Sequence, residues 1–149
     1  MPRIVRAADV GWTGSLSRGS GIASAGTSHS FELPVDLPSR IGDPEGKTSP
    51  EELLAAAHAA CYATSLAGET ARAGGTVERL DVRCTITMDE VEGKGHVIVA
   101  SELDVRGQVD GLDEEGFGRA AAAADEGCSF SKLLRASASV TVRAQLQAS

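Results

Sequence analysis

The sequence contains no apolar run approaching the roughly 20 residues that a transmembrane helix needs. Its first residues, Met1 to Arg6, also lack the apolar core of a secretory signal peptide. Cations are scarce: 14 Lys and Arg stand against 21 Asp and Glu, which gives a net charge of −7. A nucleic-acid surface needs clustered cations to neutralise phosphates. We therefore expect a soluble, cytoplasmic protein that binds neither membranes nor nucleic acid.

Repeats and low-complexity linkers are also absent from the sequence. Hydrophobic residues make up 42% of the chain and charged residues 23%, a globular balance that argues against disorder. The length of 149 residues suits one compact domain, so we predict a single domain over residues 1–149. Aromatic residues are few, at 3%, and the three cysteines stand at uneven spacing. The cysteines are therefore the first place to look for chemistry.

The N-terminal part predicts short antiparallel strands joined by hairpins. Between Val5 and Pro34, short apolar stretches alternate with turns rich in glycine and serine. The next segment, Asp36 to Lys47, contains two prolines and two glycines, which predicts an irregular loop of functional length. Arg40 lies in this loop.

Several helix-start signals coincide at Thr48–Glu52. Ser49 is a hydroxyl N-cap, Pro50 suits the first helical position, and Ser49 with Glu52 fits a capping box. The helix continues through a small, apolar middle and ends near Gly74. Because a helix without a polar face is normally buried all round, we infer that a second helix and a second subunit cover it.

The rest of the chain shows strand and helix patterns in turn. Arg79–Asp89 and Val97–Val105 predict two strands of a hairpin, in which alternate residues face inward. Helices are predicted over Glu114–Glu126 and Ser129–Arg135, and a last strand follows at 138–146. The expected fold class is α+β, with antiparallel sheets packed around two main helices.

The three cysteines have different settings. Cys84 lies at the centre of an alternating apolar face, where a free cysteine behaves as a small hydrophobe, so we assign it to the core. Cys61 lies in the alanine-rich helix, and Cys128 follows the glycine that ends the next helix. Backbone N–H groups at the start of a further helix can lower a thiol pKa. Cys61 and Cys128 each fit either a reactive role or an inert packing role.

Two other chemistries would use the same residues. His58 and Cys61 are three apart on one helical face, a spacing that suits a metal ion. The further ligands would have to come from residues outside any paired motif: Cys84, Cys128, His29 or His96. A cysteine hydrolase needs a histidine base, and His58 is poorly placed to meet the Cys61 thiol end-on. We therefore predict no metal site and interpret His58 as a packing or hydrogen-bonding residue.

Three strings of the sequence carry a resemblance: Trp12–Gly21, Thr48–Cys61 and Cys128–Leu134. They resemble the OsmC/Ohr family of osmotically inducible and organic hydroperoxide resistance proteins, over essentially the whole chain. The His-Ala-Ala-Cys string is closer to the OsmC branch than to Ohr. The resemblance implies an OsmC-like fold and an intertwined homodimer in which two cysteines reduce peroxides. One departure is Ser129, which follows Cys128 where the family usually has proline.

The resemblance also implies roles for four residues. Cys61 is the attacking, peroxidatic thiol, and Cys128 resolves its sulfenic acid as a disulfide, which an external dithiol of the lipoyl or another type reduces. Arg40 supplies a guanidinium that polarises the O–O bond, and Glu51 holds it in a carboxylate pair. Arg18 is a second candidate for the arginine.

Helix geometry separates Glu51 from Cys61. Their ten-residue spacing corresponds to roughly 15 Å along the helix axis and about 80° around it. The two residues cannot share one small site within a single chain. We therefore predict that the Arg40–Glu51 pair serves Cys61 of the other subunit, which makes the dimer obligatory for catalysis.

The resulting hypothesis is a cytoplasmic, homodimeric peroxidase that reduces organic hydroperoxides to alcohols without metal, haem or another cofactor. Its role is defence against oxidative and osmotic stress. An apolar, aromatic-poor pocket favours alkyl or fatty-acid hydroperoxides, and hydrogen peroxide stays open as a further substrate. The alternative is a non-catalytic member of the same fold that binds small molecules or has a structural role in stress. Two cysteines, an arginine and a glutamate in the expected positions favour the enzyme.

Overall fold

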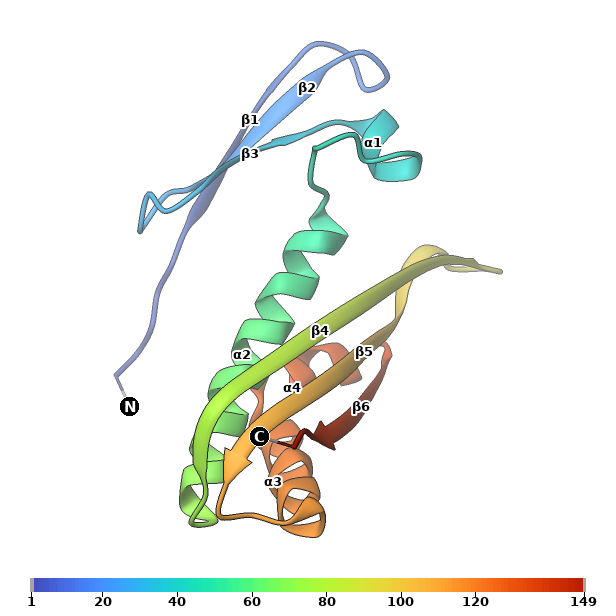
Figure 1. Cartoon of the computed structure of the whole chain (residues 1–149). Helices are drawn as coiled ribbons and strands as arrows, with labels where there is room; N and C mark the ends of the chain where they lie inside the picture. Colours follow the sequence, from blue (N-terminus) through green and yellow to red (C-terminus); the bar gives the residue numbers. More distant parts are fainter. Residues whose placement is uncertain (1, 149) are drawn as a thin grey trace. The chain divides into compact units, whose positions relative to one another are not determined.

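The computed structural model describes residues 2–148, which divide into two compact units (Figure 1). The first unit extends to Leu53 and the second begins at Leu54, so the division falls inside helix α2 (Pro50–Arg72). The order of elements along the chain is β1-β2-β3-α1-α2-β4-β5-α3-α4-β6.

The first unit contains a three-stranded antiparallel sheet. Its strands are β1 (Ala8–Thr13), β2 (Ser20–Ala25) and β3 (Glu32–Val35), in that spatial order. Gly14 follows β1 with a φ of +95°, a left-handed conformation that favours glycine at the start of a turn. The prediction of short strands joined by hairpins is confirmed.

The segment Asp36–Lys47 is not wholly irregular, which corrects the expectation of a loop. It contains the short helix α1 (Leu37–Ile41), with Arg40 in its last turn. The Asp36 carboxylate caps this helix by accepting a hydrogen bond from the backbone N–H of Ser39 at 2.9 Å. The proline of α1 lies in the first turn, where the N–H that it lacks would have no helical partner. Proline therefore permits the helix that it was expected to prevent.

Helix α2 begins and ends where the sequence signals predict. The Ser49 hydroxyl accepts a hydrogen bond from the N–H of Glu52 at 3.1 Å, which is one half of the predicted capping box. The Glu52 carboxylate accepts from the hydroxyl of Thr48 at 2.8 Å, so the other half differs from the prediction. Arg72 ends the helix, and Gly74 follows with a φ of +90°. In the described part of the chain, no helix combines the length and the apolar character that a membrane crossing requires.

One stripe of α2 is fully buried in the second unit. Its members recur every four residues: His58, Tyr62, Leu66 and Thr70. Helix α3 (Glu114–Gly127) lies against α2, and the Tyr62 hydroxyl donates to the carbonyl oxygen of Ala121 at 2.8 Å. The predicted second helix is therefore present. The remaining positions of α2 are half-buried or exposed in the single chain, so its covering by a second subunit stays a prediction.

The sheet of the second unit has mixed direction, which corrects the prediction of purely antiparallel sheets. Strands β4 (Thr76–Val91) and β5 (Gly95–Asp110) are antiparallel, whereas β6 (Ser139–Leu146) pairs parallel to β5. Helices α3 and α4 (Ser129–Arg135) lie between β5 and β6 in the sequence. A crossover of this length returns the chain to the same end of the sheet, which allows a parallel pair. The α+β class is confirmed.

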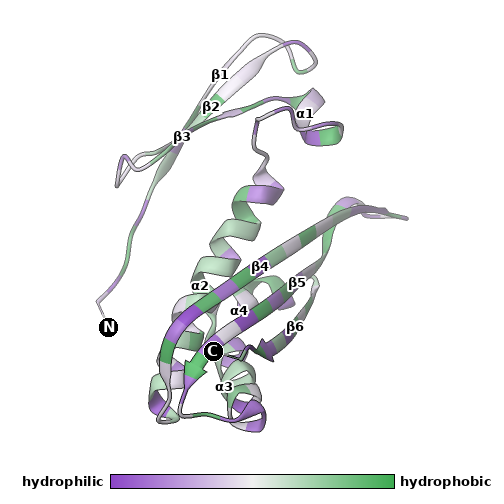
Figure 2. Cartoon of the chain, viewed as in Figure 1, coloured by the Kyte–Doolittle hydropathy of each residue, from purple (hydrophilic) through white to green (hydrophobic). Residues whose placement is uncertain are grey.

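Alternation along the strands separates core from solvent. From Leu80 to Met88, half-buried apolar residues alternate with exposed polar residues along β4, as predicted (Figure 2). Gly93 and Gly95 both have positive φ in the β4–β5 turn, where other residues would be strained. The inner face of the sheet packs with α2 and α3 into one core, which includes Tyr62, Leu66, Leu103, Val105, Phe117 and Cys128.

Gly107 on β5 lies against the ring of Phe117 in this core. A Cβ atom at Gly107 would lie 2.5 Å from Phe117 Cζ. We expect Gly107→Ala to lower the free energy of unfolding by about 1–3 kcal/mol, because overpacking displaces the ring or the strand. Chemical denaturation measures this change. The matched control is Gly118→Ala on the exposed side of α3, where nothing lies within 4 Å and alanine is expected to add about 0.5–1 kcal/mol. Wild-type stability of Gly107→Ala would contradict this packing.

Candidate active site

Two cysteines from distant parts of the sequence meet in the second unit. Cys61 lies in the middle of α2, and Cys128 lies at the junction of α3 and α4. Their sulfur atoms are 3.3 Å apart, and both are free thiols. A disulfide bond has a length of about 2.05 Å. The two thiols are therefore in direct contact, but they are not bonded to each other.

The two thiols differ in exposure. Cys128 caps both adjoining helices: its N–H donates to the carbonyl oxygen of Asp125 at 3.3 Å, and its sulfur accepts from the N–H of Ser131 at 3.4 Å. Only 1% of Cys128 is exposed, whereas Cys61 is half-buried. A molecule that approaches the single chain from solvent therefore meets Cys61 first.

Hydrogen-bond donors surround the Cys61 sulfur. The Ser129 hydroxyl lies 3.7 Å away and the Cys128 sulfur 3.3 Å away. Burial raises the pKa of the Cys61 thiol. Hydrogen bonds from the N–H of Phe130, from the side chain and N–H of Ser129, and from Cys128 outweigh burial, so the pKa lies below its ordinary value. The lowered pKa increases the fraction of nucleophilic thiolate at neutral pH.

His58 is fully buried between two serine hydroxyls. Its Nδ1 is 2.7 Å from Ser101 Oγ on β5, and its Nε2 is 2.8 Å from Ser131 Oγ on α4. Burial lowers the pKa of His58, so the ring is neutral at pH 7. Both nitrogens are engaged, which confirms the predicted hydrogen-bonding role and leaves neither nitrogen free as a base for Cys61. In the residues that the structure describes, no group of three or more His, Cys, Asp or Glu residues could hold a metal ion.

Cys84 lies on the inner face of β4, as predicted, but its surroundings are partly polar. Its sulfur is 3.2 Å from Ser101 Oγ and 3.7 Å from His58 Nδ1. Cys84 also packs against the core, and burial raises the pKa of its thiol despite the contact with Ser101. A thiol that stays protonated is a poor nucleophile. This environment favours a packing role for Cys84.

Arg40 and Glu51 form an ion pair in the first unit. Arg40 Nε donates to Glu51 Oε1 at 2.9 Å and Nη2 donates to Oε2 at 2.7 Å, which is a bidentate geometry. The hydrogen bond from Arg40 lowers the pKa of Glu51, and the same bond raises the pKa of Arg40, so both groups are charged at neutral pH. Arg18 lies in the exposed turn between β1 and β2, and the ion pairs found between residues 2 and 148 do not include it.

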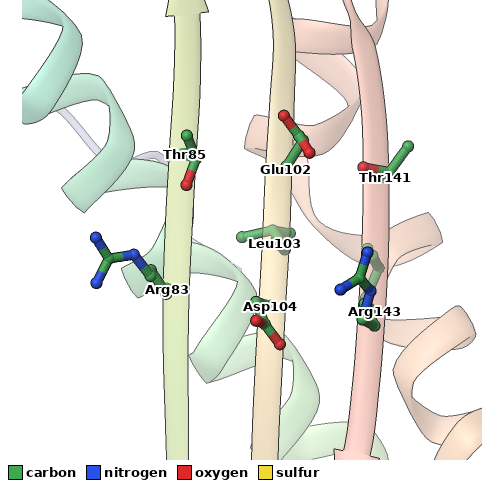
Figure 3. Close-up of a pocket in the computed structure, with 8 residues that line it drawn as sticks. Arg83, Thr85, Glu102, Leu103, Asp104, Thr141 and Arg143 are labelled. Atoms are coloured by element: carbon green, nitrogen blue, oxygen red, sulfur yellow. The ribbon is translucent and has the colours of Figure 1, made fainter.

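A shallow hollow on the outer face of the second sheet is separate from the thiols. Side chains of β4, β5 and β6 line it, as Figure 3 shows. Arg83 is the register partner of Asp104, and Asp104 is the register partner of Arg143, so opposite charges neighbour one another. These residues are exposed and alternate with the inward-facing ones. The hollow is therefore a solvated, charged face of the sheet, and the thiol pair is the candidate active site.

Three serines of this site were missed by the sequence analysis as functional residues. Ser101 occupies an inward-facing position on β5 and is fully buried. A polar residue at a strand position where the neighbouring inward-facing residues are apolar is a signal that the sequence does contain. Ser131 follows Cys128 by three residues, the spacing between an N-cap side chain and the N–H that it accepts. Ser129 was named only because it stands where the family usually has proline. No signal in the sequence shows that its hydroxyl contacts Cys61.

Comparison with known protein families gives a match over most of the chain. Residues 42–143 match the family described as OsmC-like protein. A protein named Peroxiredoxin OsmC from Escherichia coli (strain K12) is 32% identical over 125 residues, which cover 84% of this chain and 86% of that protein. A match of this extent and identity shows common family membership.

Solved structures agree on the fold. The organic hydroperoxide resistance protein OsmC from Legionella pneumophila has a TM-score of 0.76 at 20% identity, over 96% of this chain and 99% of that one. OhrB, the organic hydroperoxide resistance protein of Bacillus subtilis, has a TM-score of 0.73 at 22% identity, over 93% and 98%. The expected OsmC-like fold is confirmed, and the chain belongs to the OsmC family.

Proposed function

We propose that the protein is a thiol-dependent peroxidase that reduces organic hydroperoxides to alcohols. The observation that carries this proposal is the pair of sulfur atoms at 3.3 Å, of which Cys61 is accessible and Cys128 is buried. The names of the relatives support it, because one is a peroxiredoxin and two are organic hydroperoxide resistance proteins.

The first step occurs at Cys61. Its thiolate attacks the terminal oxygen of the hydroperoxide, an S–O bond forms as the O–O bond breaks, and the alkoxide leaves and takes a proton from water. The products are an alcohol and a Cys61 sulfenic acid. The lowered pKa of the Cys61 thiol supports this step by supplying thiolate at neutral pH.

The second step uses Cys128. Its thiol attacks the sulfur of the Cys61 sulfenic acid, the S–O bond breaks, and hydroxide leaves with the Cys128 proton as water. An external dithiol, of the lipoyl or another type, then reduces the Cys61–Cys128 disulfide in the reducing cytoplasm, where we expect the protein to act. One hydroperoxide and one dithiol thus give one alcohol, one water and one oxidised dithiol, and the sequence of steps uses no metal, haem or other cofactor.

Arg40 is the proposed cation of the site. Glu51 holds its guanidinium in a bidentate pair, which fixes the direction of the remaining N–H groups. Those groups are proposed to donate to the oxygen that becomes the alkoxide and so stabilise its charge in the transition state. Arg18 lacks a carboxylate partner among the described ion pairs, so it lacks this orientation.

A homodimer is proposed to bring Arg40 to the thiol. Helix α2 is continuous and carries both Glu51 and Cys61, and their ten-residue spacing corresponds to roughly 15 Å along its axis. The Arg40–Glu51 pair of one subunit is therefore assigned to Cys61 of the other. The small residues of α2 that the single chain leaves half-buried or exposed are the surface that a second subunit would cover.

The expected substrates are alkyl or fatty-acid hydroperoxides, with hydrogen peroxide as a poorer one. The composition supports this choice, because the chain is rich in small apolar residues and only 3% aromatic. The biological setting that follows is defence against oxidative stress, and the OsmC name of the curated relative adds osmotic stress.

An assay of the wild-type protein with cumene hydroperoxide and dihydrolipoamide tests the function. We expect consumption far above the rate of the dithiol alone, with equal amounts of alcohol and oxidised dithiol. Without dithiol, mass spectrometry of the oxidised protein should find a peptide pair joined through Cys61 and Cys128. The control is protein alkylated with iodoacetamide. If treated and untreated protein consume the hydroperoxide equally slowly, the chain is a non-catalytic member of the fold and the peroxidase proposal is wrong.

A further inference from the structure

Ser129 directs its hydroxyl at the sulfur that is proposed to react. Its Oγ lies 3.7 Å from Cys61 Sγ, within hydrogen-bonding range for the large sulfur atom. Ser129 is the first residue of α4 and directly follows Cys128, so one short stretch of backbone carries both the second thiol and this hydroxyl. Among the described residues, the Cys61 sulfur is the one side-chain partner of the Ser129 hydroxyl.

The donors around Cys61 have different fates during the proposed reaction. The Cys128 thiol, 3.3 Å from Cys61 Sγ, is consumed when the disulfide forms. The Ser129 hydroxyl takes part in no covalent bond of either step, so it remains a donor throughout. Hydrogen bonds to a charged acceptor are stronger than those between neutral groups, so this donor acts most on the thiolate and on the departing hydroxide.

We propose that Ser129 is a further catalytic residue, whose hydroxyl donates to the Cys61 thiolate before the attack and to the sulfenic acid oxygen after it. This inference rests on the proposed peroxidase function. In the first state the hydroxyl stabilises the nucleophile. In the second it stabilises the charge that develops on the oxygen leaving as Cys128 attacks.

Substitutions at position 129 separate the two donors of this residue. Ser129→Ala removes the hydroxyl alone, and Ser129→Thr keeps both the hydroxyl and the N–H. Ser129→Pro removes both donors but suits the first position of a helix. The Ser129 side chain is exposed, and the cap of α4 is Cys128, which all three variants keep. All three are therefore expected to unfold at the same denaturant concentration as the wild type.

The first readout is the rate at which iodoacetamide alkylates Cys61 at pH 7, followed by mass spectrometry of its peptide. Ser129→Ala is expected to slow this alkylation about three- to tenfold. The loss of one hydrogen bond to the charged sulfur lowers the thiolate fraction, and the greater nucleophilicity of the remaining thiolate offsets part of that loss. Ser129→Pro is expected to slow it further, and Ser129→Thr to stay near wild type. The second readout is the rate constant for cumene hydroperoxide in excess dithiol, where the same order is expected.

Ser137→Ala is the matched control, because Ser137 is an exposed serine shortly after α4 and is expected to leave both rates unchanged. Wild-type rates of Ser129→Ala in both readouts would overturn the role of the hydroxyl. An equal loss in Ser129→Thr and Ser129→Ala would overturn it as well. A wild-type protein that consumes no hydroperoxide overturns the peroxidase proposal itself, and the alkylation rates do not depend on that activity.

Discussion

Replacing Cys61 with serine is expected to lower hydroperoxide consumption by at least about a thousandfold, to the rate of the dithiol alone. A serine hydroxyl is not ionised at neutral pH, so it cannot replace the thiolate that attacks the O–O bond. The exposure of the two thiols supports this choice of nucleophile, because Cys61 is half-buried and Cys128 is 1% exposed. Loss of cumene hydroperoxide with dihydrolipoamide as reductant measures the effect.

Replacing Cys128 with serine has a different expected outcome. The variant should consume one equivalent of hydroperoxide per chain in a rapid burst and then slow, because the Cys61 sulfenic acid lacks its partner at 3.3 Å. A 1,3-diketone that traps sulfenic acids should label Cys61 in this variant and much less in the wild type. Wild-type steady-state turnover by Cys128→Ser would show that Cys128 is not the resolving thiol.

Cys84→Ser is the matched control for both cysteine variants. Burial raises the pKa of the Cys84 thiol, and its sulfur contacts Ser101 and His58 rather than either reacting thiol. We therefore expect Cys84→Ser to retain wild-type turnover, with an effect confined to stability. Loss of turnover in Cys84→Ser to the level of Cys61→Ser would contradict the assignment of chemistry to Cys61.

Local signals in the sequence predict the long helix and the hairpins of this fold well. The start of α2 depends on Ser49, Pro50 and Glu52, which lie within one helical turn, and its end depends on the glycines that follow. The β4–β5 hairpin depends on the alternation of β4 from Leu80 to Met88 and on Gly93 and Gly95. Each of these signals acts over a few residues, so no tertiary information is needed to interpret it.

Two features of the fold could not be predicted in this way. Helix α1 was missed because Pro38 within it, and the proline and two glycines that follow it, outweighed a single N-cap, Asp36. The direction of β6 is set by the path of α3 and α4, and alternation is the same in parallel and antiparallel strands. The direction of β6 is therefore set by the connection through α3 and α4, and it cannot be predicted from the residues of β6 alone.

The candidate site depends on contacts between residues far apart in sequence. Cys61 and Cys128 are 67 positions apart. From the residues alone, each cysteine could be either a reactive thiol or an inert packing residue. The family resemblance suggested the pair, and the packing of α2 against the α3–α4 junction supplies the physical reason. The contacts of His58 with Ser101 and Ser131 join α2 to β5 and α4, so they depend on strand register and helix packing that no local pattern encodes.

Mixing two inactive variants is expected to restore activity if the Arg40–Glu51 pair serves the opposite subunit. Arg40→Ala should lower turnover about a hundred- to a thousandfold, because it removes the group that stabilises the leaving alkoxide. Cys61→Ser is expected to be inactive, because serine supplies no thiolate at neutral pH. In a heterodimer of the two, the Arg40→Ala subunit supplies a thiol and the Cys61→Ser subunit supplies an arginine, so one of the two sites is intact. Subunits that exchange at random should recover about a quarter of wild-type turnover, because half of the dimers are mixed.

The same mixing experiment contains its own control. Arg40→Ala and Glu51→Ala damage the same ion pair, so their heterodimer has a defective pair at both sites and should not recover beyond its parents. Native mass spectrometry confirms that mixed dimers have formed in each case. If mixed dimers of Cys61→Ser and Arg40→Ala form but stay inactive, the arginine serves the thiol of its own chain. That outcome would contradict the assignment of the Arg40–Glu51 pair to the opposite subunit.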